Sequence, residues 1–176
     1  MSNLFPDERV RSTYEIDFEH WYKEGKRGLL FDIDNTLVPH GAPADEKAIA
    51  LFKRLQNIGF QTVLISNNGE PRVKSFADQV GSLYIFKANK PSVKNYLKAC
   101  ELMKITKEQA LFIGDQIFTD IWGANRAGIR TILVNPIHPK EEIQIILKRI
   151  PEWFILKAWE ISRRRSVTVE KQKRIR

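Results

Sequence analysis

Hydrophobic and polar positions along the chain fall into blocks that predict strands and helices in regular succession. Five short apolar runs predict strands, and these runs end near Phe31, Ser66, Phe86, Ile113 and Val134. The stretches between them carry apolar residues at helical spacing, and Gly59 and Gly128 end two of these stretches. Strands that alternate with helices favour a parallel sheet with helices on both faces. The pattern therefore predicts an α/β fold with a five-stranded, mainly parallel sheet.

The regions outside the five predicted strands differ in character. Before the first strand, residues 17–25 have a capping Asp17, aromatic residues at helical spacing and a terminating Gly25, which predicts a short helix. After the last strand, residues 141–150 and 153–163 are amphipathic and predict two more helices. A chain of 176 residues suits one domain, which we expect over residues 1–162, followed by a tail over residues 163–176.

The positive charge of the chain is concentrated in this tail. Seven basic residues and one acid give residues 163–176 a charge of +6, out of +8 for the whole chain. The excess of Lys and Arg therefore bears on binding partners rather than on the fold. Peripheral contact with an anionic membrane and a solvated end without a partner both explain such a tail. Contact with nucleic acid is a further alternative, although the tail lacks interleaved aromatic residues.

Composition excludes several classes of protein. No apolar run approaches the roughly 18–20 residues that a membrane-spanning helix needs. The N-terminus has neither the basic region nor the apolar stretch of a secretory signal, so we expect a cytoplasmic protein. One cysteine, Cys100, excludes an internal disulfide, and it continues the apolar face of a predicted helix. Three scattered histidines form no zinc pattern, and nothing in the sequence indicates an oligomeric state.

The stretch from Gly28 to Leu37 holds the first candidate for chemistry. Its first half is an apolar run that predicts a buried strand, and its second half contains an Asp-Asn-Thr sequence that favours a turn. Asp32 and Asp34 thus lie one residue apart where a buried strand ends. Two carboxylates there need a cation or a shared proton, and oxygen ligands favour Mg²⁺ over zinc. The alternative is an Asx-type turn in which both carboxylates bond to the backbone.

Three later predicted strands also lead into polar or charged residues. Ser66 ends the second strand, and Lys90 follows the third. Asp115 follows the fourth strand, with Asp120 five residues further along. The carboxyl ends of parallel strands meet at one edge of a sheet, which is where ligands bind in folds of this class. We therefore expect these side chains to converge with the two carboxylates of the first strand.

The order of these residues resembles that of the haloacid dehalogenase (HAD) superfamily. Residues 32–37, Asp-Ile-Asp-Asn-Thr-Leu, resemble its first motif, and three further motifs follow in the family's order within residues 28–136. The resemblance implies a three-layer, Rossmann-like fold and a phosphomonoester hydrolase. It makes Asp32 the nucleophile that forms an aspartyl-phosphate, and Asp34 the general acid and base.

The second and third motifs supply candidates for binding the phosphoryl group. Ser66 resembles the hydroxyl residue of the second motif, and Asn67 is placed beside it as a phosphate-binding residue. Lys90, in a Lys-Pro pair before a predicted helix, resembles the lysine of the third motif, with Lys87 as a rival. A strand-end hydroxyl and a solvated loop lysine are the alternatives for Ser66 and Lys90.

The fourth motif supplies the remaining metal candidates. Residues 114–120, Gly-Asp-Gln-Ile-Phe-Thr-Asp, resemble this motif, whose first aspartate is Asp115 here. The resemblance implies a Mg²⁺ site formed by Asp32, the backbone carbonyl of Asp34, and Asp115, with Asp120 as a ligand through water. For Asp120, an acid that merely initiates a helix is the alternative.

Spacing and motif details narrow the resemblance. The intervals before and after Ser66 leave no room for a cap domain, so we expect a solvent-open site. The first and fourth motifs resemble subfamily IIIA, and with residues 123–128 the pattern resembles its YqeG-like branch, related to phosphatidylglycerophosphate phosphatases. A phosphomonoester substrate is implied, with a phospholipid as one candidate. The alternative is a weakly catalytic or non-catalytic HAD-fold protein whose basic tail binds RNA, the ribosome or another anionic partner.

Overall fold

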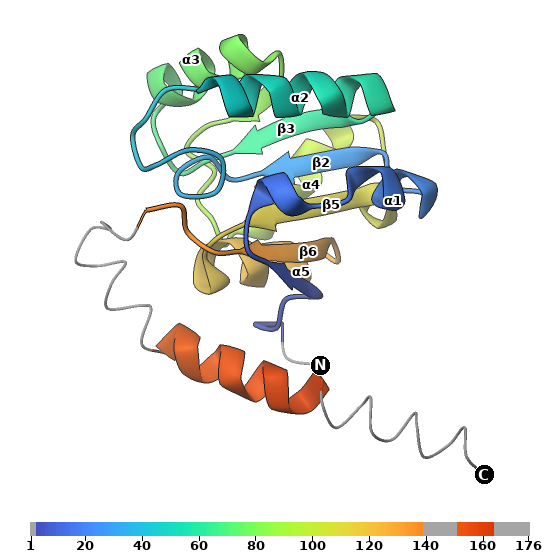
Figure 1. Ribbon diagram of the computed structural model, residues 1–176, viewed down its shortest axis with the longest axis vertical. Helices are drawn as coiled ribbons and strands as arrows, with labels where there is room; N and C mark the ends of the chain where they lie inside the picture. The colour runs from blue at the N-terminus through green and yellow to red at the C-terminus, as the bar shows by residue number, and fades with distance from the viewer. Residues whose placement is uncertain (1–2, 139–150, 164–176) are drawn as a thin grey trace.

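The computed structural model describes residues 3–138 and 151–163, which contain a parallel sheet of six strands (Figure 1). The strands are β1 (Glu8–Val10), β2 (Gly28–Phe31), β3 (Gln61–Ile65), β4 (Leu83–Ile85), β5 (Ala110–Gly114) and β6 (Arg130–Val134). Their order across the sheet is β1-β6-β5-β2-β3-β4, and every neighbouring pair is parallel. The carboxyl ends of all six strands therefore lie at one edge, as expected from the sequence.

Helices cover both faces of this sheet, which confirms the predicted layers. They are α1 (Phe18–Lys23), α2 (Glu46–Ile58), α3 (Glu70–Val80), α4 (Val93–Leu102) and α5 (Trp122–Arg126). Apolar residues of α1, α2 and α3 pack on one face, and those of α4 and α5 pack on the other. The chain between β2 and β3 contains α2 and a connecting loop, without a cap domain. None of the helices in the described parts of the chain is long and apolar enough to cross a bilayer.

The number of strands differs from the prediction of five. The additional strand is β1, which pairs with β6 so that Glu8 lies opposite Ile132 and Val10 opposite Val134. Asp7, just before β1, accepts a hydrogen bond from the backbone N–H of Thr131 at 2.9 Å. β1 has three residues, of which one is apolar, so no apolar run marks it in the sequence. Its partner lies far along the chain, which local patterns do not record.

Capping residues lie at the ends of the helices, and among them Asp17 and Gly59 stand where the sequence predicts them. Asp45 accepts a hydrogen bond from the N–H of Ala48 at the start of α2, and Gly59 ends this helix with a φ of 108°. Asp17 caps α1 through the N–H of His20. Because these caps satisfy backbone groups that the helices leave unpaired, they fix where each connection to the next strand begins.

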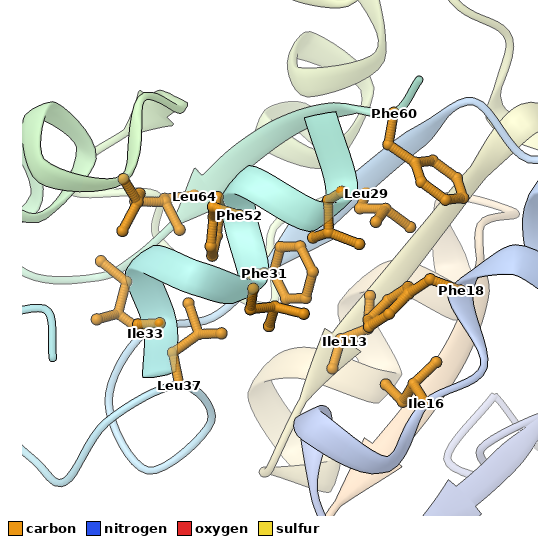
Figure 2. Close-up of a cluster of buried hydrophobic side chains, with 14 of the residues drawn as sticks. Ile16, Phe18, Leu29, Phe31, Ile33, Leu37, Phe52, Phe60, Leu64 and Ile113 are labelled. Atoms are coloured by element: carbon orange, nitrogen blue, oxygen red, sulfur yellow. The ribbon is translucent and has the colours of Figure 1, made fainter. Parts of the chain in front are cut away.

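The central strand β2 is buried on both faces. Leu29 and Phe31 lie in one hydrophobic cluster, while Leu30, which points the other way, lies in the second. Figure 2 shows Phe31 beneath α2, where its ring centroid lies 5.3 Å from that of Phe52. A strand packed between two layers is held rigidly, so β2 fixes the position of the residues that follow Phe31.

The segments after β6 are described only in part. The predicted helix over residues 141–150 and the tail from residue 164 onward lie outside the described residues. The helix predicted for residues 153–163 is confirmed and spans residues 151–163. It lies beside the β1–β6 side of the sheet in Figure 1, where Ile155 and Leu156 pack near Leu133. This helix therefore extends the hydrophobic core at that side.

Cys100 belongs to the core, as its place in the predicted helical face indicates. It lies in α4 and is 5% exposed. Burial raises the pKa of its thiol to about 11, so little thiolate forms near neutral pH. Its environment is that of a packing residue.

Candidate active site

The residues that follow β2 and β5 bring three carboxylates together at the carboxyl edge of the sheet. Asp32 follows β2 directly, Asp115 follows β5 directly, and Asp120 lies on the π-helical turn η3 (Ile117–Ile121). One carboxylate oxygen from each lies within 4.8 Å of the others. All three residues are buried, with exposed fractions of 7%, 1% and 0%. The predicted convergence of these two motifs is therefore present in the structure.

Lys90 joins two of these carboxylates. Its Nζ donates hydrogen bonds to Oδ1 of Asp32 at 2.5 Å and to Oδ1 of Asp120 at 2.6 Å. The rival lysine, Lys87, is exposed at the surface. Lys90 is held in turn by Asn67, whose Oδ1 accepts from the Lys90 backbone N–H at 2.7 Å and whose Nδ2 donates to the Lys90 carbonyl at 3.4 Å. The structure thus places Lys90, and not Lys87, among the carboxylates.

Burial and charge shift the proton affinities in this cluster. Burial raises the pKa of Asp32 to about 7; the Lys90 ammonium opposes this rise, while the Asp120 charge adds to it. Burial alone would lower the pKa of Lys90, but the charges of Asp120 and Asp32 outweigh it and hold this pKa above its usual value. Lys90 therefore remains protonated at neutral pH. The raised pKa of Asp32 reflects an excess of acidic groups over the one ammonium, and either a proton on Asp32 or a further cation balances this excess.

Thr36 links the first and fourth motifs, a contact that the sequence did not indicate. Its Oγ1 lies 3.3 Å from Oδ1 of Asp115 and 3.5 Å from Oδ2 of Asp32, so the hydroxyl can donate to either carboxylate. Thr36 is 1% exposed. It was part of the first-motif resemblance, but only the folded chain shows which groups its hydroxyl meets. Its hydroxyl thus lies between two of the three carboxylates.

Asp120 enters the cluster because the neighbouring backbone leaves room for it. A Cβ atom on Gly114 would lie 2.6 Å from Oδ2 of Asp120, so a side chain at residue 114 would collide with this carboxylate. The same Oδ2 accepts a hydrogen bond from the N–H of Gln116 at 3.1 Å. The turn that carries Asp120 is tied to helix 151–163, since Glu152 accepts from the N–H of Ile117 at 2.9 Å. Asp120 thus faces the carboxylate cluster rather than solvent.

Asp34 lies next to the cluster, but its side chain points elsewhere. Its carboxylate accepts hydrogen bonds from the N–H of Gly41 and from the side chains of Asn68 and Arg72. None of these donors belongs to the carboxylate cluster. Asn68 and Arg72 follow β3. Together with Asp34 they form a second cluster of polar side chains at this end of the sheet, which the sequence did not indicate.

Ser66 lies at the carboxyl end of β3, where the sequence predicts it. It is 2% exposed, and its Oγ accepts a hydrogen bond from the N–H of Asn68 at 3.2 Å. The backbone N–H of Ser66 donates to Ile85, and its carbonyl accepts from Ala88, so the residue is fixed between β3 and the loop that carries Lys90. Because the Ser66 Oγ acts as an acceptor toward Asn68, its own O–H proton can be donated to another oxygen.

Sequence comparison places the chain among hydrolases. A family model described as haloacid dehalogenase-like hydrolase matches residues 41–128. The protein named "Probable phosphatase YqeG" from Bacillus subtilis is 37% identical over 156 residues, which cover 88% of this chain and 91% of that protein. "Phosphatidylglycerophosphate phosphatase 1, chloroplastic/mitochondrial" from Arabidopsis thaliana is 26% identical and covers 89% of this chain. The match spans 48% of that longer protein, about half its length.

Structural comparison agrees on the fold. An uncharacterized protein from Listeria monocytogenes aligns with a TM-score of 0.53 at 18% identity, covering 66% of this chain and 84% of that chain. The cobalt-bound deoxy-D-mannose-octulosonate 8-phosphate phosphatase from Haemophilus influenzae aligns with a TM-score of 0.52 at 16% identity, covering 63% and 69% of the two chains. The family model and the similarity to YqeG confirm the prediction of a HAD-type phosphatase. The chain belongs to the haloacid dehalogenase-like hydrolase family.

Proposed function

We propose that this protein hydrolyses phosphomonoesters through an aspartyl-phosphate on Asp32, with Mg²⁺ as its cofactor. The observation that carries the proposal is the position of Asp32. It is a buried carboxylate at the end of the central strand, bonded to Lys90 and adjacent to Asp115 and Asp120. A nucleophilic carboxylate must approach an anionic phosphoryl group, so the positive charge next to it has a direct function.

The residues present fit a divalent cation with oxygen ligands. Three buried acidic groups lie together, and the one ammonium among them pairs with Asp32 and Asp120, so acidic groups outnumber cations where little water screens them. We assign the binding of Mg²⁺ to Asp32, Asp115 and the backbone carbonyl of Asp34. Asp120 would act through water, because its Oδ1 bonds to Lys90 and its Oδ2 accepts from the N–H of Gln116. When bound, the ion supplies charge neutralisation between the nucleophile and the phosphoryl oxygens.

In the proposed reaction, an oxygen of Asp32 attacks phosphorus, and the bond from phosphorus to the leaving oxygen breaks. Asp34 gives its proton to that oxygen and then takes a proton from a water molecule. The oxygen of this water attacks phosphorus, the bond from phosphorus to Asp32 breaks, and phosphate leaves. Ser66 and Lys90 hold the phosphoryl oxygens. The Asn67 side chain already bonds to the Lys90 backbone, so we assign its contact with phosphate to its backbone N–H.

A phospholipid is the substrate class that we propose first, with phosphatidylglycerophosphate as the specific candidate. Two observations support it: the similarity to the Arabidopsis phosphatase of that name, and a site without a cap domain that a large substrate can reach. The basic tail would then bring a cytoplasmic enzyme to an anionic membrane surface. A non-catalytic protein that binds RNA or the ribosome is less well supported, because it has no need for an organised set of carboxylates around Lys90.

Phosphate release from phosphatidylglycerophosphate in mixed micelles tests this proposal. We expect release with Mg²⁺, loss of release when EDTA removes the ion, and recovery when Mg²⁺ is added back, because three carboxylates cannot bind an anionic substrate unaided. Release that persists in EDTA would contradict the metal requirement. Hydrolysis of other phosphomonoesters without any release from this lipid would contradict the lipid assignment.

A further inference from the structure

Both oxygens of the Asp34 carboxylate are occupied by donors outside the proposed metal site. Oδ1 accepts from the N–H of Gly41 at 2.8 Å and from Nη2 of Arg72 at 3.1 Å, and Oδ2 accepts from Nδ2 of Asn68 at 2.5 Å. The side chains of Asp34 and Arg72 are only 13% and 22% exposed. A general acid has to reach the leaving oxygen of the substrate. At least one of these contacts must therefore be exchanged during the reaction.

Arg72 has donor capacity that its contact with Asp34 does not use. Its Nε is buried and has no hydrogen-bond partner among the described residues. A buried donor without a partner is costly, so an arginine that served only to pair with Asp34 would be poorly arranged. Its guanidinium presents Nε–H and Nη–H side by side, and this edge matches the two oxygens of a phosphate or carboxylate.

The place of Arg72 in the fold also suits a substrate contact. It lies in the first turn of α3, which begins directly after the loop from Ser66 to Gly69. The guanidinium carbon lies 5.5 Å from the centroid of the Phe76 ring, which holds the side chain along the helix toward Asp34. An anion that reached this edge would lie beside the acid and not at the carboxylate cluster.

We propose that Arg72 binds a second anionic group of the substrate and so selects phosphomonoesters that carry one. The proposal rests on the proposed function, because it concerns recognition at the same site. The second anion takes the place of Asp34 at Nη2 and also bonds to Nε. This exchange frees the Asp34 side chain to turn toward the leaving oxygen. A substrate without the second anion leaves the pair of Arg72 and Asp34 closed, so recognition and the position of Asp34 are coupled.

Two soluble substrates whose leaving oxygen is a primary hydroxyl of a glycerol unit test the proposal. Glycerol phosphate carries one phosphate, whereas glycerophosphoglycerol phosphate carries a phosphodiester as well. We expect wild type to favour the second in kcat/KM, and we expect Arg72→Met to remove that preference. The loss on the diester substrate should be roughly 10- to 100-fold, the range for a charged bidentate contact. Arg72→Lys should recover part of it, since it keeps the charge but not the two-point contact.

A matched control and a binding measurement separate this proposal from the proposed function. Lys74→Met removes a neighbouring cation on the exposed side of α3, where Lys74 pairs with Asp78, and should leave the preference unchanged. Calorimetric binding in an Asp32→Asn background needs no turnover, and there Arg72→Met should weaken binding of the diester substrate alone. If Arg72→Met alters binding of both compounds equally, or of neither, the proposal is wrong, whether or not the protein hydrolyses them.

Discussion

Asp32→Asn is expected to lower the kcat for phosphomonoester hydrolysis by roughly ten-thousand-fold or more, because it removes the nucleophile and leaves only the surrounding charges. The fold should persist. Asn has nearly the same shape as Asp, and Lys90 keeps its second partner, Asp120. Burial disfavours the charged form of Asp32, so replacement by a neutral group removes a desolvation cost along with a favourable ion pair. Steady-state kinetics and thermal unfolding of purified variants measure both effects.

Asp78→Asn is the matched control for this variant. Asp78 undergoes the same substitution on the exposed side of α3, where it pairs with Lys74. It should retain wild-type turnover. Turnover by Asp32→Asn within tenfold of wild type, in a protein that remains folded, would contradict the role of Asp32.

Lys90→Met is expected to reduce both stability and activity. The ammonium is the shared partner of Asp32 and Asp120, and its side chain is 4% exposed. Its removal leaves two buried carboxylates without their cation, which should lower the free energy of unfolding by about 3–5 kcal/mol in metal-free buffer. Added Mg²⁺ should recover part of this stability, since a cation then balances the carboxylates. Turnover should fall roughly 100- to 1,000-fold, as for loss of a transition-state charge contact.

Lys87→Met separates this effect from a general loss of positive charge. Lys87 is exposed and lies three residues before Lys90, so its loss should change neither stability nor turnover appreciably. Chemical denaturation with and without Mg²⁺ provides the comparison. If Lys87→Met were the more damaging variant, the assignment of the third-motif lysine to Lys90 would be wrong.

Those parts of the fold that leave a local pattern could be predicted from the sequence. β2 and β5 are buried along their whole length and β3 is buried from Thr62 to Ile65, so each strand contains a continuous apolar run. Asp45 and Gly59 mark the ends of α2 because capping depends on residues next to the helix itself. β1 could not be predicted in this way. It is held to the sheet by pairing with β6 and by the contact of Asp7 with Thr131, 124 residues apart.

In the candidate site, too, residues marked by a local sequence pattern could be predicted, and contacts between distant residues could not. The motif order located Asp32, Lys90 and Asp115 because all three follow strands, and the strands of a parallel sheet end at one edge. The order of the motifs does not indicate in which direction each side chain points. An arginine in an amphipathic helix is ordinarily a solvated cation, so nothing in the sequence indicated that Arg72 would contact Asp34. The contact of Thr36 with two carboxylates was hidden for the same reason, since it joins residues that the fold alone brings together.

The most direct test of covalent catalysis by Asp32 is to trap the phosphoenzyme. Acetyl phosphate and p-nitrophenyl phosphate have good leaving groups, so either can phosphorylate the enzyme with little help from a general acid. The Asp34→Asn substitution removes the proposed base and so slows the attack of water on the phosphoenzyme. After an acid quench and proteolysis, mass spectrometry should find one phosphoryl group on the peptide that contains Asp32, and none after Asp32→Asn. A phosphoryl group on another residue, or turnover of these substrates with no phosphorylated peptide in either protein, would contradict the mechanism.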